Sequence, residues 1–340
     1  MKAPDANKVA GCLIGQCLGD ALGFIVEGQP TTICSRYVDD VVRTGNTHDL
    51  RRGRYPFGQY SDDSQLAREL VISIVDRGKF DPVDYAGRIA VLFREDRVVG
   101  RGSATEAAAA RLIRGIPWNE AGEPPPSAGN GSAMRAGPVG LLCFGSSDDL
   151  VRTAHDQGRI THNDRRCSAG AIAIAGAVAL NLREKTLSAA DFIAQLSVLA
   201  EPFDPILALG LQHIPRWLCQ SPSTAASEIS KAGVTLGFDG GWQGISPFVT
   251  ASVLWSIYSF LRSPDDYMES ICTAMAVGGD VDTTAAMTGA ISGALVGLDR
   301  LPSELAQQVN DAGTWGHHEL VLLAHRCHSV ATGKEFSARS

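Results

Sequence analysis

Two short acidic motifs are the residues of this sequence best suited to chemistry. Ser61-Asp62-Asp63-Ser64 carries two adjacent carboxylates between hydroxyls, and Gly278-Gly279-Asp280-Val281-Asp282-Thr283 repeats this design after two glycines. Oxygen-only sets of this kind suit hard cations such as Mg²⁺, Mn²⁺ or Ca²⁺. Helix capping is the alternative use, because Ser and Asp both favour helix N-termini. Capping explains one acid at a helix start but not two such pairs, so we predict a site for two metal ions.

Three further stretches could contribute to the same site. Glu27 follows a glycine-interrupted helix, where a lone acid is normally a solvated helix end. The Gly129–Arg135 stretch, GNGSAMR, supplies backbone N–H groups and one Arg, which let a phosphate or ribose approach the main chain. An ordinary turn before a helix is the alternative for that stretch. A single histidine such as His162 is more often a helix cap or a satisfied core group than a catalyst.

The elements that must position these residues are helices. After Asp63, residues Leu66, Leu70, Val71, Ile74 and Val75 fall on one helical stripe. Similar patterns predict helices over Lys8–Leu22, Val83–Phe93, Thr105–Arg114, Leu187–Leu199, Phe248–Phe260 and Tyr267–Val277. Alternating β-branched runs are almost absent, which favours an all-α fold. The small residues from Ala285 to Gly297 predict a helix packed closely at the centre of the bundle, since each glycine inside a helix costs about 1 kcal/mol against alanine.

The distance between the acidic motifs decides the domain organisation. They lie more than 200 residues apart, so if they share one site the chain is one domain over residues 1–340. We therefore predict an all-α, single compact orthogonal helical bundle with a dinuclear metal site in a central cleft. Glu120–Gly131, rich in Pro and Gly, is then a loop of this domain and not a linker.

Composition limits the classes of partner. Thirty basic against 37 acidic residues leave a net charge of −7, so we expect no extended nucleic-acid surface. The eight cysteines contain no CxxC pair, and the longest apolar run, Ala169–Leu182, is shorter than the roughly 20 residues of a membrane span. With no secretory-signal pattern at the start, we expect a reduced, cytoplasmic, soluble monomer with no membrane partner.

Together these motifs resemble the ADP-ribosylglycohydrolase superfamily, which includes the dinitrogenase reductase-activating glycohydrolases and the ADP-ribosylarginine hydrolases. Five stretches match in order between Gly11 and Gly297. They are the GDALGxxxE segment ending at Glu27, SDDS from Ser61, GNGSAMR from Gly129, THxxxxxxA from Thr161 and GGDVDTTAA from Gly278.

The resemblance implies a hydrolase that removes ADP-ribose from a modified protein or small-molecule acceptor, by cleaving the glycosidic bond at ribose C1 with two divalent cations. Mg²⁺ is the expected ion, with Mn²⁺ as the alternative. It implies that one ion is bound by Ser61, Asp62, Asp63 and Asp282 and the other by Asp280, Asp282 and Thr283. The implied catalytic residues are Glu27, Asp62 and Asp280. The implied substrate contacts are Gly129, Asn130, Gly131, Ser132, Met134, Arg135 and His162, with Trp242 and the Gly240-Gly241 turn assigned more loosely.

Two departures from the family pattern bear on the expected function. Ser61 and Ser64 stand where Thr is common, and because Ser keeps the oxygen we expect metal binding to survive. The segment Val98–Thr105 has no acid, whereas arginine-directed members hold the guanidinium with one there. The acceptor therefore stays open among arginine, serine, a nucleic-acid base, a polymer and a free metabolite. Two other functions stay open as well: a non-catalytic ADP-ribose-binding or crystallin-like relative, and a metal-dependent hydrolase of another nucleotide.

Overall fold

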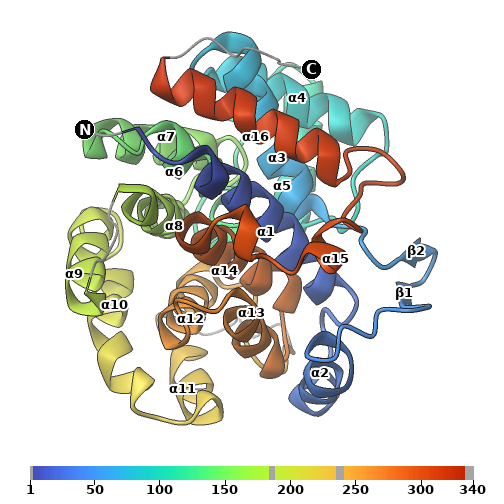
Figure 1. Ribbon diagram of the computed structural model, residues 1–340. Coiled ribbons are helices and arrows are strands. Elements are labelled where there is room, and N and C mark those ends of the chain that lie inside the picture. The colour runs from blue at the N-terminus through green and yellow to red at the C-terminus, as the bar shows by residue number, and fades with distance from the viewer. Residues whose placement is uncertain (1–2, 184–187, 235–240, 334–340) are drawn as a thin grey trace.

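The structure is a computed structural model that describes residues 3–183, 188–234 and 241–333. It confirms the all-α prediction, because the described chain is built from helices joined by loops, with one two-stranded hairpin (Figure 1). The α-helices are α1 (Ala6–Phe24), α2 (Thr31–Tyr37), α3 (Asp62–Arg77), α4 (Pro82–Arg94), α5 (Ser103–Ile113), α6 (Gly137–Leu142), α7 (Ser147–Arg159), α8 (Arg165–Arg183), α9 (Ala189–Ala200), α10 (Pro205–Leu218), α11 (Pro222–Ile229), α12 (Val249–Arg262), α13 (Tyr267–Ala276), α14 (Val281–Val296), α15 (Ser303–Ala306) and α16 (His317–Thr332). Short π- and 3₁₀-helical turns are η1 (Val38–Val42), η2 (Asn130–Ser132) and η3 (Leu298–Arg300).

The predicted helices are present with small shifts at their ends. The stripe after Asp63 lies on α3, and the stretch expected from Leu187 begins at Ala189, Leu187 itself lying outside the described residues. Side-chain caps explain several starts: Ser61 caps α3, Asp81 caps α4 and Ser188 caps α9 by accepting backbone N–H groups of the first turn.

The two helices that lead into the acidic site, α1 and α14, lie against each other at the centre of the molecule (Figure 1). Gly11, Gly15, Gly19 and Gly23 recur every fourth residue and so form one face of α1. A Cβ added to Gly15 would lie 2.5 Å from Gly289 O, and one added to Gly19 would lie 2.3 Å from Ala285 O. The backbones of α1 and α14 are therefore in direct contact at positions where a larger side chain would separate them. The prediction that the small-residue helix lies at the centre of the bundle is confirmed.

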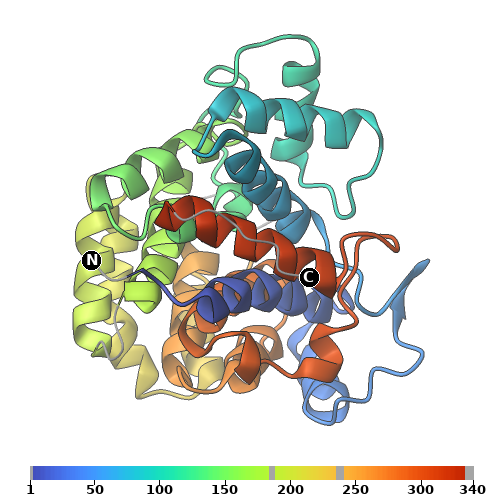
Figure 2. The ribbon, with the colours of Figure 1, turned by 45° about the horizontal axis from the view of Figure 1, so that its top comes forward.

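The remaining helices surround this pair. Helix α14 also packs against α8, α12 and α13, while α16 covers α1 and α3. Figure 2 shows α4 and α5 extending outward beyond α3, away from the central pair. The hairpin of β1 (Arg51–Arg52) and β2 (Tyr55–Pro56) projects from the opposite edge to α9 and α10. Its pairing, Arg51 with Pro56 and Arg52 with Tyr55, is antiparallel.

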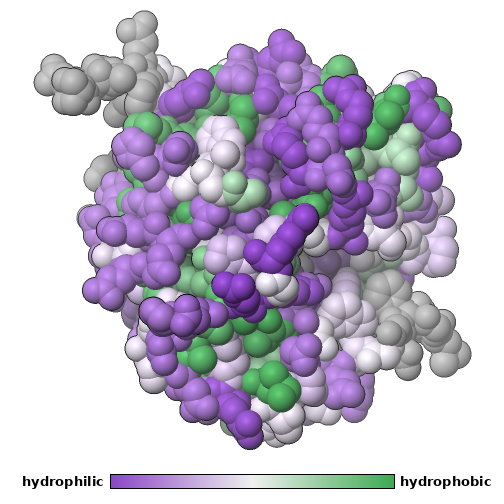
Figure 3. All heavy atoms as spheres, turned by 90° about the vertical axis from the view of Figure 1, so that its right-hand side faces the viewer, coloured by the Kyte–Doolittle hydropathy of each residue, from purple (hydrophilic) through white to green (hydrophobic). Residues whose placement is uncertain are grey.

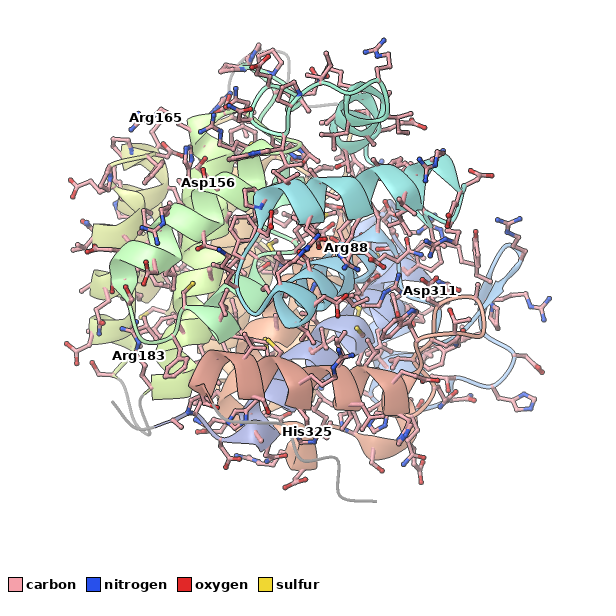
Figure 4. All side chains as sticks on the ribbon, turned by 90° about the horizontal axis from the view of Figure 1, so that it is seen from above. Arg88, Asp156, Arg165, Arg183, Asp311 and His325 are labelled. Carbon is pink, nitrogen blue, oxygen red and sulfur yellow. The ribbon has the colours of Figure 1, made fainter. Side chains whose placement is uncertain are left out.

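A buried ion pair attaches the segment before α16 to α3. Asp311, labelled in Figure 4, accepts a 2.7 Å hydrogen bond at Oδ2 from Nη1 of Arg68, whose side chain is fully buried. Gln65 donates to the other oxygen of Asp311 at 2.8 Å and accepts at its own Oε1 from the backbone N–H of Val99. This network joins the segment before α16 to the loop between α4 and α5.

Two further expectations concern cysteines and membranes. All eight cysteines are free thiols, Cys219 being exposed and the other seven buried. Across the described ranges, no helix is both long enough and apolar enough to cross a bilayer.

Candidate functional site: a carboxylate cleft

The two acidic motifs meet where α3 and α14 begin and α1 ends. They open into a cleft of about 600 Å³ on the side of the molecule that carries the hairpin. Figure 3 looks onto that side, where hydrophilic side chains predominate over smaller hydrophobic patches. The lining residues are Glu27, Arg52, Asp62, Asp63, Gly100, Arg101, Gly102, Ser103, Ala104, Thr105, Ser127, Gly129, Asn130, Gly131, Met134, His162, Trp242, Pro247, Asp280, Asp282 and Thr283.

The first acidic motif starts α3 slightly earlier than expected, at Asp62 instead of near Ser64. Ser61 is the N-cap: its hydroxyl accepts the N–H of Asp63 and donates to Asp63 Oδ2 at 2.9 Å. Because both acids are already helical, they point in different directions, about 100° apart around the helix axis. Asp63 faces α14, where Thr283 Oγ1 lies 3.3 Å from its Oδ2.

Asp62 faces the loop between α4 and α5. Its N–H donates to Val99 O at 2.7 Å, which fixes this loop to the start of α3. Gly100 has a φ of +75°, and a Cβ added there would lie 3.2 Å from Asp62 Oδ1. A glycine at this position therefore leaves the carboxylate of Asp62 open to the cleft.

Asp20 holds the first motif from behind. Its two oxygens accept the backbone N–H groups of Ser61 and Ser64 at 2.9 and 3.0 Å. Asp20 is fully buried on α1, and this burial raises its pKa to about 6. With both oxygens used by backbone donors, Asp20 acts as a support of the site, which ties α1 to α3.

The second motif turns sharply into α14, as its two glycines predict. Gly278 and Gly279 have φ values of +78° and +93°, which glycine adopts without strain. Two neighbouring loop segments fix the turn by backbone hydrogen bonds. Gly28 N donates to Gly279 O at 2.9 Å, and Asp280 N donates to Ile245 O at 2.8 Å. The segment that carries Glu27 is thereby attached directly to the motif that carries Asp280.

Carboxylate oxygens of Glu27, Asp280 and Asp282 lie within 4.8 Å of one another, the one such set of three potential metal ligands in the described ranges. Burial, then the charge of Glu27, raises the pKa of Asp280 to about 7. Burial and neighbouring carboxylates also raise the pKa values of Asp62, Asp63 and Asp282 well above their usual range. Asp63 Oδ1 is buried with no hydrogen-bond partner among the described residues. Crowded, desolvated carboxylates with an unpartnered oxygen are the donor set that a divalent cation stabilises.

Glu27 has a cationic partner that the sequence analysis did not identify. Arg52, on β1, forms an ion pair with Glu27 through Nη1, and the same nitrogen donates to Phe24 O at 2.9 Å. The guanidinium lies 4.5 Å from the centre of the Phe24 ring. Glu27 is thus held at the rim of the cleft by the hairpin. No local sequence signal marks Arg52, because its role depends on how the hairpin folds back onto the end of α1.

The predicted substrate-binding residues fall into two groups. Gly129, Asn130, Gly131, Met134, His162 and Trp242 line the cleft, whereas Ser132 and Arg135 lie behind its wall. Ser61, predicted as a metal ligand, does not line the cleft either, and its hydroxyl donates to Asp63. Ser132 donates to Cys167 O at 2.9 Å, and Arg135 donates to Gly131 O at 3.0 Å. Gly240 lies outside the described residues. The loop is also less exposed than expected, since Asn130 N donates to Pro247 O.

The start of α5 is a part of the cleft wall whose role the sequence analysis did not predict. Gly102 to Thr105 line the cleft, and the N-cap, Gly102, has no side-chain capping bond. The four first N–H groups of a helix lack intrahelical partners, so such a helix start favours anions. A helix after Gly102-Ser103 is visible in the sequence, but its direction toward the cleft is not.

Comparison with known proteins identifies the family of this chain. The family model described as ADP-ribosylglycohydrolase matches residues 1–335. Human ADP-ribosylhydrolase ARH3 is 29% identical, covering 96% of this chain and 94% of its own. The ADP-ribosylarginine hydrolase Tri1 of Pseudomonas putida is 26% identical, covering 92% of this chain and 76% of its own. A solved structure titled "ADP-ribosylglycohydrolase-related protein complex" superposes with a TM-score of 0.70 at 25% identity, over 96% of this chain and 98% of that one. With a family model that spans nearly its whole length, this chain belongs to the ADP-ribosylglycohydrolase family.

Proposed function

We propose that the protein is a metal-dependent ADP-ribosyl hydrolase, which cleaves the glycosidic bond at ribose C1 of an ADP-ribosylated acceptor and releases ADP-ribose. The observation that carries the proposal is the carboxylate cluster of buried Asp280 and Asp282 with half-buried Glu27, which lines a cleft of about 600 Å³. Such a cleft has the size of a small-molecule site. Relatives named ADP-ribosylhydrolase and ADP-ribosylarginine hydrolase add support.

The residues present fit a pair of divalent cations, with Mg²⁺ proposed and Mn²⁺ as the alternative. Asp280, Asp282 and Thr283 would hold one ion beside Glu27, and Ser61, Asp62, Asp63 and Asp282 would hold the other. The unpartnered Asp63 Oδ1 and the raised carboxylate pKa values support this fit. The chemistry that divalent cations supply at such a site is orientation of sugar hydroxyls and activation of a water molecule.

The side chains of this protein then have distinct roles. Glu27 transfers a proton at the scissile bond, as a carboxyl group does in other glycosidic cleavages, where the transition state resembles an oxocarbenium ion. Arg52 holds Glu27 at the rim, and Asn130 orients Asp280 through a 2.6 Å hydrogen bond. Asp62, whose carboxylate lies beside Gly100, would take part in the chemistry as a ligand of the second ion.

Nucleotide binding is assigned to the wall opposite the hairpin. We propose that Gly129, Gly131 and His162 contact the ribose and pyrophosphate, while Trp242 offers a half-buried ring at the cleft. Ser132 and Arg135 shape this wall from behind, since their polar groups are engaged by Cys167 O and Gly131 O.

The charges around the α5 wall disfavour an arginine-linked acceptor. The two acids that flank this loop in sequence, Asp96 and Glu106, both pair with Arg101, and the cleft also carries Arg52. A guanidinium acceptor would meet Arg101 at this loop and would find both flanking acids already paired. We therefore propose an acceptor whose leaving group is neutral or anionic.

A hydrolysis panel of defined acceptors, with and without EDTA, tests the proposal. ADP-ribose release from a neutral or anionic linkage should stop with EDTA and return with Mg²⁺ or Mn²⁺. Full turnover in metal-free buffer would contradict metal dependence. Tight ADP-ribose binding without hydrolysis of any acceptor would favour a non-catalytic ADP-ribose-binding protein. Hydrolysis of unmodified nucleotides would favour a metal-dependent hydrolase of another nucleotide.

A further inference from the structure

A chain of three buried side chains runs behind the wall of the cleft. Arg135 Nη2 donates to Thr161 Oγ1 at 2.8 Å, and Thr161 Oγ1 lies 2.8 Å from His162 Nδ1. Arg135 and Thr161 are fully buried, and His162 is 3% exposed. His162 is the member of this chain that lines the cleft. The direction of the hydrogen bond between Thr161 and His162 decides what His162 can offer to a ligand.

Arg135 fixes the first link. Its Nε donates to Gln157 Oε1 at 2.9 Å, its Nη1 to Gly131 O at 3.0 Å and its Nη2 also to Gln157 O at 2.9 Å. A guanidinium has donors and no acceptor, so Thr161 Oγ1 must accept from it. The rigid anchoring of Arg135 makes this direction permanent.

The second link follows from the hydroxyl of Thr161. Its hydrogen needs an acceptor, because an unpaired buried polar group is costly. Among the described residues, His162 Nδ1 is the one acceptor that the hydroxyl reaches. An accepting Nδ1 carries no proton, and in a neutral imidazole the proton is then on Nε2.

We infer that Thr161 and Arg135 are positioning residues that hold His162 as the Nε2–H tautomer, a neutral hydrogen-bond donor aimed at the cleft. Cβ atoms added to Gly131 and Gly129 would lie 3.0 and 3.4 Å from Nε2, so this nitrogen faces the glycines of the wall. Within the described ranges Nε2 has no hydrogen-bond partner. It is a donor available to a ligand.

The electrostatic surroundings of His162 support the neutral form. Burial, and then the charge of Arg135, lower the pKa of His162 to about 3, against a smaller opposing effect of Asp164. The ring therefore stays neutral at neutral pH, and the tautomer alone decides whether the cleft meets a donor or an acceptor. The identity of the ligand rests on the proposed function: a donor at this wall suits an oxygen of the ribose or pyrophosphate of ADP-ribose.

Nitrogen NMR of the protein labelled with ¹⁵N-histidine tests the tautomer directly, without ligand. The His162→Gln variant identifies the His162 signals by their loss. We expect a protonated, pyrrole-type Nε2 and an unprotonated, pyridine-type Nδ1 in the wild type. Thr161→Ser, which keeps the hydroxyl, should preserve this pattern, and Thr161→Val should shift it toward a mixture of tautomers.

ADP-ribose titration calorimetry measures the consequence for binding. Thr161→Val should weaken ADP-ribose binding about tenfold, the scale of one hydrogen bond, and Thr161→Ser should stay near the wild type. Thr153→Val is the matched control, since Thr153 is a buried threonine on α7 whose hydroxyl contacts Cys143 and does not line the cleft.

Several outcomes would overturn the inference. A protonated Nδ1 in the wild-type spectrum would contradict the inference. This test needs no variant, so it remains decisive even if the Thr161→Val protein fails to fold. An unchanged tautomer and unchanged affinity in folded Thr161→Val would contradict the inference as well. Failure of the wild type to bind ADP-ribose would instead contradict the proposed function, and the ligand-free spectrum would still decide the tautomer.

Discussion

The side-chain amide of Asn130 donates a 2.6 Å hydrogen bond to Asp280 Oδ2, across 150 positions of the chain. This bond joins the glycine-rich wall of the cleft to the carboxylate cluster. It also opposes the burial and the Glu27 charge that raise the pKa of Asp280. The glycine-rich wall, proposed to bind the nucleotide, is therefore in direct contact with the proposed metal centre.

Replacing Asn130 with Ala should weaken metal binding and turnover together. The lost hydrogen bond to a charged group corresponds to about 1.5–3 kcal/mol, or roughly ten- to a hundredfold. Titration calorimetry with Mn²⁺ and steady-state kinetics would measure both. Asn119→Ala, at an exposed asparagine, is the control and should change neither. A change in turnover with intact metal affinity would argue against the coupling.

Asp282→Asn should be more damaging than Asp62→Asn. Asp282 belongs to the set of close carboxylates and is proposed to contact both ions, whereas Asp62 faces the Gly100 loop. We expect Asp282→Asn to lose more than about 100-fold in Mn²⁺ affinity, beyond the 10–100-fold usual for residues that only orient ligands. If Asp282→Asn keeps most of its affinity and activity, the bridging assignment is wrong.

Glu27→Gln should reduce kcat by about 10²-fold or more, the usual scale for a lost general acid or base. ADP-ribose affinity should stay close to the wild type, because Gln keeps the size and one oxygen. Glu304→Gln, at an exposed acid on α15, is the matched control. Glu69 is unsuitable as a control because it pairs with the buried Arg68. Near-normal turnover of Glu27→Gln at saturating substrate and metal would return Glu27 to a structural role.

Gly15→Ala should destabilise the fold, because its Cβ would lie 2.5 Å from Gly289 O on α14. Overpacking of this kind costs about 1–3 kcal/mol or more. Urea denaturation would measure it. Gly87→Ala on α4 is the control, since a Cβ there meets nothing within 4 Å and alanine favours a helix by up to about 1 kcal/mol. Equal stability of Gly15→Ala and the wild type would mean that α1 and α14 are less closely packed than described.

The protein kept metal-free with EDTA should lose stability as pH rises from about 4 to about 7. Burial raises the pKa of Asp280 from 3.8 to about 7 and that of Asp20 to about 6, so in this window the folded state binds more protons than the unfolded state. The free energy of unfolding then falls with increasing pH. Mg²⁺ should restore stability at pH 8. Asp280→Asn should have a smaller pH dependence than the wild type in urea denaturation, and an identical dependence would contradict the role of Asp280.

The sequence by itself determined the features that depend on local patterns. Apolar periodicity located α3, α4 and α12, and the Ser-Asp-Asp and Gly-Gly-Asp motifs located the starts of α3 and α14. Both signals depend on residues within a few positions of each other: a helix buries one stripe, and its first N–H groups need nearby acceptors. The family resemblance rests on the same motifs.

The tertiary structure alone decided which residues meet across the chain. It placed Arg52 on Glu27 and put Asp20 behind Ser61 as a support. It also turned Arg135, expected at the substrate, away from the cleft and onto Thr161. The residue type alone does not show whether a guanidinium or carboxylate group binds a ligand, caps a helix or pairs with a buried group. What selects among these uses is the packing of segments distant in sequence. The small residues of α14 predict close packing, but they do not specify that its partner is α1, which only the tertiary structure decided.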